Sequence, residues 1–499
     1  MAKKIVVIGG GISGLTAGIY ALQAGFDVEI YESHNVAGGM CAQWQRKGSE
    51  CTSAIHWMMG AQDNSDLNEI WKTTGAIDQN TEIFVLDYIS ACPNEDKYSY
   101  LHADISRLEE ELLQLSPIDE SSIKELISEI KIHRRLPIPA SKPMDLMEPM
   151  EKAIAFAPYI KAEKQSSLKN ISIAEYVERF QSSVIRNLLL SVVPNSRIST
   201  DTLMIWLAAS CNSNTTFPCD GFFAMAKRME KKFLSLGGKI YFNSKVEKIN
   251  VSNGVATSIA LANGKEIQAD YIIPTISPDV LLKKLLNNQF KDIYFEQRFE
   301  SPNSFFTPAL TLLNLSVNAD VSKLPHTLVL EPHNPLFINK TEIQYLKINH
   351  YSFAPDFCKG GKTLMQVVLQ EQEFEYWKKL KATSSADYQQ AKNNLAAKVI
   401  EEIEIVYPEI KGKIELLDVA TPLTLQRYCH SYKGAYLSFC AMNEVRRENH
   451  IGTIFEVNNL YLAGQWALQD GGLPMAAVAG KFAVQRICNQ ENNNNINSK

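Results

Sequence analysis

The N-terminal residues alternate between apolar runs and small side chains in an order typical of a strand, a helix and a second strand. Apolar residues fill positions 5–8, and apolar side chains alternate with acidic ones over the short run 27–31. Between them, residues 13–25 carry small and apolar side chains at the spacing of a buried helix. This order predicts the first unit of an α/β fold with a parallel sheet.

The pattern changes further along the chain. Residues 105–190 carry Leu, Ile, Glu and Lys at helical spacing, with hydroxyl caps predicted at Ser116 and Ser172. Further helices are predicted over 223–236 and 373–404. The tail 489–499, with its run of Asn, is predicted to be disordered. Short alternating runs predict strands over 239–242, 246–251, 258–261, 271–273, 310–315, 343–348 and 363–369.

A glycine-rich turn joins the first predicted strand to the first helix. Gly9, Gly11 and Gly14 have the G-x-G-x-x-G spacing, in which the first permits a tight turn and the second lets the backbone approach a pyrophosphate. The third lets helix and strand pack closely, and the helix N-terminus, with Ser13, faces the phosphates. Glu32 ends the second strand, where a carboxylate can accept from a ribose hydroxyl. These features predict a dinucleotide site, and a purely structural glycine turn is the alternative.

Composition narrows the classes of function. A chain of 499 residues is long enough for two domains, and its net charge of −5 gives no reason to expect nucleic acid. Nine cysteines without any C-x-x-C predict reduced, mostly buried thiols, and no metal-binding spacing appears. No signal peptide and no apolar span of about 20 residues is found. We expect a cytoplasmic protein.

The residues after Glu32 resemble a large FAD-binding family that includes amine oxidases and phytoene desaturases. In that family a second glycine pair, similar to Gly38-Gly39, passes close to the flavin's pyrophosphate. Many members carry Arg after the pair, whereas Met40 stands here, which leaves phosphate binding more dependent on backbone amides. Val246 lies in a segment similar to the family's strand in which a valine backbone holds the adenine.

The C-terminal region resembles the other end of the same flavin site. Residues 459–464 are predicted to form a short buried strand, and an Ala-rich helix with Pro474 at its first helical position follows. In the family the flavin ring lies against this helix start, whose N–H groups face the N1–C2=O edge. A core helix with small residues for close packing is the alternative. The resemblance implies that the flavin contacts here are Gly464, Gln465, Gly472, Leu473 and Met475.

Further segments are similar to the phytoene desaturase, carotenoid isomerase and retinol saturase group, and to its bacterial members in particular. Residues 48–60 look like the segment that passes under the flavin, which implies that Ile55 and His56 lie near the ring. Gln465 stands where many relatives use Asp toward the ribityl chain. His56 is the candidate acid or base, because histidine titrates near neutrality. A hydrogen-bonded packing histidine is the alternative.

The resemblance implies a fold and a function. The fold is α/β, with a Rossmann-type, glutathione-reductase-like FAD domain assembled from residues 1–75, 215–290 and 425–488. An α+β substrate domain with a mixed sheet and helices covers 76–214 and 291–424. Members of the group desaturate, saturate or isomerise C–C double bonds of long apolar isoprenoids, carotenoids or other polyenes, by hydride transfer at flavin N5.

Two other functions stay open at this point. One is an amine oxidase-type flavin oxidase of a small molecule. The other is a non-catalytic protein that binds lipids or prenyl chains, since guanine-nucleotide dissociation inhibitors share the fold and bind no flavin. A flavin that responds to amines would favour the first alternative, and a colourless protein would favour the second.

Residues 136–162 combine apolar side chains with prolines and lysines. We expect the prolines to rule out one long regular helix. Such a mixture is typical of a segment that lies on a membrane face, which predicts reversible, peripheral binding to the inner face of the membrane. The alternative is that these residues line the substrate tunnel or cap the core.

Overall fold

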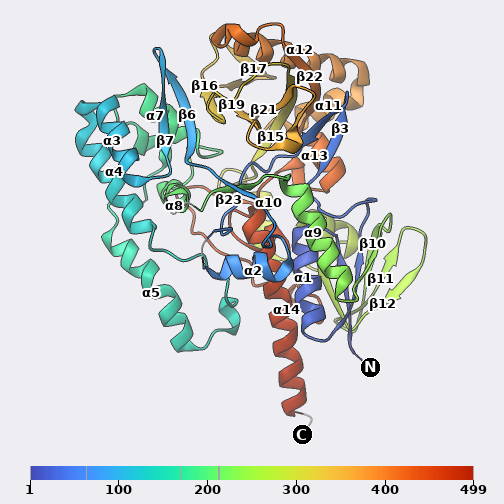
Figure 1. Cartoon of the computed structure of the whole chain (residues 1–499). Coiled ribbons are helices and arrows are strands. Elements are labelled where there is room, and N and C mark those ends of the chain that lie inside the picture. The colour runs from blue at the N-terminus through green and yellow to red at the C-terminus, as the bar shows by residue number, and fades with distance from the viewer. Residues whose placement is uncertain (1, 63, 169, 212–213, 498–499) are drawn as a thin grey trace.

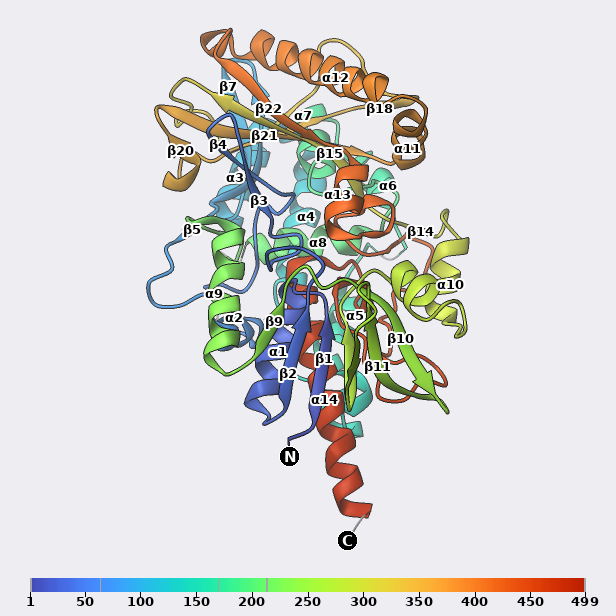
Figure 2. The same ribbon diagram turned by 90° about the vertical axis from the view of Figure 1, so that its right-hand side faces the viewer.

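A four-stranded parallel sheet forms around the N-terminus, in the order β13-β1-β2-β9. In the computed structural model, which describes residues 2–62, 64–168, 170–211 and 214–497, this sheet occupies the lower half of the molecule (Figures 1 and 2). Segment 459–463 runs beside β13 through bonds such as Tyr461 N to Ile272 O at 3.0 Å, but it forms bridges and no regular strand. The strands of the sheet are β1 (Lys4–Ile8), β2 (Asp27–Tyr31), β9 (Lys239–Tyr241) and β13 (Tyr271–Pro274).

Alternate residues of β1 pack in opposite directions, so both faces of the sheet are buried. Ile5 and Val7 join a core that includes side chains of three helices, whereas Val6 and Ile8 pack toward a three-stranded antiparallel sheet. Burial on both faces explains why β1 is a continuous apolar run. The helices are α1 (Ile12–Gln23), α9 (Gly221–Ser235) and α14 (Gly472–Asn497), and the antiparallel strands are β10 (Val246–Ser252), β11 (Val255–Leu261) and β12 (Glu266–Gln268).

A mixed eight-stranded sheet lies above the parallel sheet in Figure 1, in the order β22-β15-β21-β19-β16-β6-β7 with β20 beside β21. Its upper face packs against α11 (Phe374–Thr383) and α12 (Ser385–Val406). Its lower face is turned toward the parallel sheet. Its strands are β6 (Tyr88–Asn94), β7 (Lys97–His102), β15 (Ala309–Val317), β16 (Thr327–Leu330), β19 (Leu346–His350), β20 (Cys358–Lys359), β21 (Lys362–Glu371) and β22 (Ile414–Ala420).

The helices that follow β7 form a separate layer at one side of the two sheets (Figure 1). The predicted cap Ser172 accepts from Glu175 N at 3.3 Å and forms a capping box that begins α6. The other predicted start, Ser116, is followed by a short 3-10 turn and then α4. The helices of this layer are α3 (Ile105–Leu115), α4 (Glu120–His133), α5 (Pro149–Gln165), α6 (Ile173–Val177), α7 (Ser183–Leu190) and α8 (Thr200–Ser210).

Short elements complete the fold, including a π-helix over Val280–Leu285. The fold class is the predicted one: α/β, with a Rossmann-type parallel sheet, a mixed sheet and helices. The remaining elements are α2 (Asp66–Thr74), α10 (Ile293–Glu300), α13 (Pro422–Cys429), β3 (Gln43–Arg46), β4 (Ser49–Thr52), β5 (Ile83–Val85), β8 (Thr216–Pro218), β14 (Phe305–Phe306), β17 (Leu336–Ile338), β18 (Thr341–Ile343) and β23 (Cys440–Ala441).

The predicted disorder of the tail 489–499 is wrong up to Asn497. Helix α14 continues to that residue, and 498–499 lie outside the described residues. Glu491 accepts from Lys3 Nζ at 2.7 Å and from the hydroxyl of Tyr271. These contacts hold the helix against the N-terminal end of the sheet, which composition alone cannot reveal.

The expectation that the prolines exclude one long helix over 136–162 is confirmed, because residues 136–148 contain only a short 3-10 turn (Met144–Leu146) and the helix α5 begins at Pro149. Helix α5 has 17 residues. Pro149 occupies the first helical position, where a missing N–H is tolerated, and Glu148 and Glu151 form a capping box around it. Pro158 lies inside the helix.

Candidate functional site

A cavity of about 870 Å³ lies where the carboxyl ends of the parallel strands meet the lower face of the mixed sheet. Ligands of open α/β sheets bind at this end of the strands. The cavity brings together most of the cofactor and catalytic residues predicted from the sequence. They are Gly9, Gly11, Ser13, Glu32, Gly38, Gly39, Met40, Ile55, His56, Gly464, Gln465, Gly472 and Leu473.

Two glycine turns face each other at the lower end of the cavity. Gly38 N donates to Gly10 O at 2.9 Å, and Gly38 is bridged to Gly11. A Cβ on Gly11 would meet only the Cα of Gly39, at 3.8 Å, so the space above Gly11 opens into the cavity. Gly11 is also the N-cap of α1, and no side chain of the described residues caps this helix start. Free N–H groups at an open helix start fit a pyrophosphate.

Glu32 fixes the shape of the first glycine turn. Its Oε2 accepts from Gly10 N at 2.6 Å, and its Oε1 accepts from His34 N at 2.8 Å and from Ser33 Oγ at 3.1 Å. The carboxylate is buried and borders the cavity. Its predicted bond to a ribose hydroxyl stays a prediction.

The front and back motifs are joined directly. Gly464 N donates to Ser13 Oγ at 2.7 Å. Helices α1 and α14 also approach so closely that a Cβ on Gly480 would lie 2.5 Å from Ser13 O. Gln465 Oε1 accepts from Gly472 N at 3.0 Å, which occupies one N–H at the start of α14. The two ends of the chain therefore build one continuous site.

Three of the predicted cofactor residues do not line this cavity. A Cβ on Gly14 would lie 2.0 Å from Gly9 O, so Gly14 is needed for the turn itself. Val246 begins β10 and packs into the core behind the parallel sheet. Met475 is half-buried on α14 and packs against the helix core. A direct contact of these side chains with the cofactor stays a prediction.

His56 borders the cavity with an unusual environment. Its Nε2 is buried and has no hydrogen-bond partner among the described residues. Burial, and secondly the charge of Lys347, lowers the pKa of His56 to about 3. The expectation that His56 titrates near neutrality is therefore wrong for this environment. At physiological pH it is a neutral imidazole.

The lower face of the mixed sheet gives the cavity an apolar wall. Leu310 and Leu312 of β15 pack with Val368 of β21 and Ala420 of β22. Such a wall excludes water and offers contact area to an apolar ligand. Aromatic and apolar side chains from other elements extend it, namely Ile55, Trp57, Met58, Met59, Val192, Trp206, Phe223, Tyr436 and Leu437.

Sequence reasoning missed Lys347, which also lines the cavity. The available signal is the alternation of the predicted strand 343–348, which places this lysine opposite its apolar neighbours. Alternation does not tell whether that face of the strand meets solvent or a cavity.

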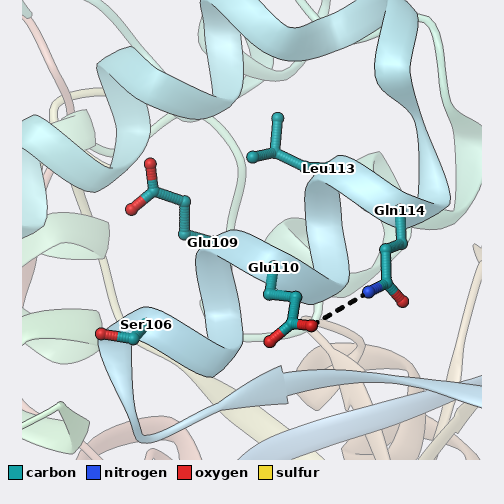
Figure 3. A pocket seen from close by; sticks show the side chains of 5 residues that line it. All are labelled: Ser106, Glu109, Glu110, Leu113 and Gln114. Atoms are coloured by element: carbon teal, nitrogen blue, oxygen red, sulfur yellow. Dashed lines mark hydrogen bonds between the residues drawn. The ribbon is translucent and has the colours of Figure 1, made fainter.

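A second, open depression follows the outer face of α3 (Figure 3). Its five lining residues, from Ser106 to Gln114, all belong to this helix. The one interaction among them is the bond from Gln114 Nε2 to Glu110 Oε1 at 3.1 Å. The side chains belong to a solvated helix face and do not converge on a common point, so this depression gives no functional site.

Known proteins resemble the chain over nearly its whole length. Prolycopene isomerase of Daucus carota is 23% identical, with 97% of this chain and 79% of the relative covered. All-trans-retinol 13,14-reductase of Homo sapiens is 22% identical, with 92% and 82% covered. The crystal structure of an oxidoreductase from Methanosarcina mazei superposes with a TM-score of 0.60 at 16% identity, covering 97% of this chain and all of the other. This last likeness confirms the fold.

The sequence model of one protein family, described as "Flavin containing amine oxidoreductase", matches residues 12–488 of this chain. This range begins inside the first glycine turn, just after Gly11, and includes the apolar wall and the start of α14. The predicted cofactor, FAD, and the predicted enzyme class, a flavin oxidoreductase, are confirmed. The chain belongs to the flavin-containing amine oxidoreductase family.

Proposed function

We propose that the protein desaturates, saturates or isomerises C–C double bonds of a long apolar polyene. The observation that carries this proposal is the cavity itself, which is lined at one end by the glycine turns and at the other by Leu312 and Val368. The names of the two relatives, a prolycopene isomerase and a retinol reductase, support a polyene as the substrate class.

Residues at different places along the cavity have different roles. The turns at Gly11 and Gly39 and the start of α14 hold FAD. FAD, when bound, supplies hydride transfer to or from a substrate carbon. The apolar wall orients the polyene and excludes water. The neutral imidazole of His56 offers Nε2 as a hydrogen-bond partner or proton carrier at the substrate.

Anaerobic mixing of the FAD-loaded protein with different substrates tests this proposal. We expect retinol or lycopene to change its polyene spectrum on mixing with the oxidised or the reduced enzyme. The flavin spectrum should change with it in desaturation or saturation and return to its starting state in isomerisation. Putrescine and benzylamine should change neither. Flavin bleaching by amines alone would establish an amine oxidase. A purified protein that binds polyenes but no FAD would establish the prenyl-binding alternative.

The variant His56→Gln tests the role of the imidazole. We expect it to retain FAD and to lose at least about tenfold in turnover, the usual lower range for a proton-transferring group. Because burial holds the pKa of His56 near 3, the imidazole is neutral from about pH 5 upward. The wild-type rate should therefore show no His56 ionisation between about pH 5 and 8. Turnover equal to wild type at every pH would leave His56 as a packing residue.

We further propose that α5 mediates peripheral membrane binding. Of its 17 residues only Ala162 is buried. Met150 and Ile154, one helical turn apart, are 72% and 68% exposed. Exposed lysines such as Lys152 and Lys161 flank these apolar residues, a mixture that fits an anionic membrane surface. None of the helices in the described ranges is long and apolar enough to cross a bilayer.

Sedimentation with anionic liposomes at low salt tests the membrane proposal. We expect wild type to sediment and Met150→Glu/Ile154→Glu to lose at least about tenfold in liposome affinity, because two charges replace buried apolar contacts. The matched control is Phe337→Glu/Ile405→Glu, which changes two exposed apolar residues on β17 and α12, at the opposite end of the molecule from α5 in Figure 1. Wild type that stays in the supernatant would refute the proposal.

A further inference from the structure

Lys347 belongs to the cavity's upper wall. It lies on β19 between Leu346 and Ile348, which pack upward into the core beneath α12. Because side chains alternate along a strand, Lys347 projects downward into the cavity. Strand register places it opposite Val368 of β21, which in turn pairs with Leu312 of β15.

The row continues to Ala420 of β22, which pairs with Leu312. Four neighbouring strands thus contribute Lys347 and then three apolar side chains to one line across the wall. With about 4.8 Å between strands, the line spans roughly 14 Å. An extended ligand bound along this line would meet the cation of Lys347 at one end and only apolar side chains along the rest of its length.

The ammonium group of Lys347 has no partner in the part of the chain that the structure describes. Its Nζ forms no hydrogen bond and no ion pair with any residue in the described ranges, and burial alone lowers its pKa to about 8. Lys347 is half-buried, and the part of it that stays exposed lines the cavity. The other cavity lysine, Lys392, differs, because the carboxylate of Asp418 opposes the effect of burial on its pKa.

No charged group of the described residues offsets the effect of burial on the pKa of Lys347. Its partners in the two neighbouring strands are Val329 of β16 and Val368 of β21. His56 also lines the cavity, close enough for the charge of Lys347 to lower its pKa, and it is neutral at physiological pH. A buried cation without a counter-ion is unfavourable, and a ligand that brings the anion relieves this cost.

We propose that Lys347 binds the carboxylate of the substrate, so that the enzyme acts on a polyene acid in preference to a hydrocarbon or an alcohol. This inference rests on the proposed function and names its substrate class more narrowly. The ion pair fixes one end of the ligand at β19. The conjugated chain then lies along Val368, Leu312 and Ala420.

Equilibrium titration of the FAD-loaded protein with retinoic acid and retinol tests the inference, with tryptophan quenching as the signal, because Trp57 and Trp206 line the cavity. At about pH 7 we expect the acid to bind ~10- to 100-fold more tightly than the alcohol, the usual range for a charge-assisted bond. Lys347→Met should abolish this preference and keep the affinity for retinol. Lys347→Arg should retain the preference, and so should the control Lys392→Met.

The pH dependence gives a second readout. Because burial lowers the pKa of Lys347 to about 8, the free protein loses the cation above that pH. The affinity for retinoic acid should fall there in wild type and stay flat in Lys347→Met, while the affinity for retinol stays flat in both.

Several results would overturn the inference. Equal affinities for acid and alcohol in wild type, or an unchanged preference in Lys347→Met, would show that Lys347 does not bind the carboxylate. An adduct of retinal on Lys347 that borohydride reduction traps would show that the residue forms an imine instead. A flavin that responds to retinol or lycopene but not to the acid would refute only this inference. Failure of all polyenes to bind would refute the proposed function as well.

Discussion

The variant Gly11→Glu is expected to fold and to lose FAD. The backbone of Gly11 has a φ of −73°, which any residue adopts, and a side chain there points into open space bordered by Gly39. A glutamate therefore fills the phosphate space without disturbing the turn. Its charge at about 4 Å from a phosphate costs about 4 kcal/mol at an effective dielectric constant of about 20, or ~1000-fold in affinity.

FAD titration of the flavin-free protein measures this effect. The matched control is Gln23→Glu, which adds the same charge at the exposed end of the same helix and should bind FAD like wild type. Gly14 is a poorer probe, because its Cβ would collide with Gly9 O inside the turn. If the Gly11→Glu protein retained FAD in the same stoichiometry as wild type, the phosphate site could not lie at this turn.

The variant Gly480→Val is expected to weaken both the fold and the cofactor site. A Cβ on Gly480 would lie 2.5 Å from Ser13 O and 3.1 Å from Ala17 N, so α1 and α14 must move apart. Overpacking of this kind costs about 3 kcal/mol. The same displacement stretches the bond from Gly464 N to Ser13 Oγ, which joins the two halves of the site.

Thermal unfolding with and without FAD follows this loss. We expect a lower melting temperature for Gly480→Val and a smaller shift on addition of FAD, because the displaced site binds the cofactor more weakly. The control Asn489→Val introduces the same side chain at an exposed position of α14 and should melt like wild type. Equal melting curves for Gly480→Val and wild type would show that the two helices do not need close contact.

The beginning of the fold was predictable because its signals are local. The strand at 27–31 and the helix after Gly11 follow from apolar periodicity and a glycine turn, and the structure places them within about two residues of the prediction. The start of α14 was predictable for the same reason. The proximity of Gly464 to Ser13 could be inferred only by resemblance to a family, because neither segment contains a sequence signal for contact with the other.

The rest depends on contacts that the sequence does not display. Helix α5 begins at Pro149, where a helix accepts proline, and it also continues through Pro158. The tail remains helical to Asn497, and Glu491 within it bonds to Lys3 and Tyr271 near the other end of the chain. In the sequence, Lys347 looks like any lysine on a half-exposed strand, and only the folded structure shows that it faces a cavity. The neutral state of His56 likewise arises from burial that tertiary packing creates.

A crystal structure of the FAD-loaded protein with a bound retinoid tests the central claim, that one cavity holds both the cofactor and an apolar polyene. The account predicts the FAD pyrophosphate between Gly11 and Gly39, and the polyene against Leu312 and Val368. A retinoid bound outside this cavity, or a flavin whose ring fills the space beside Leu312 and Val368, would contradict it.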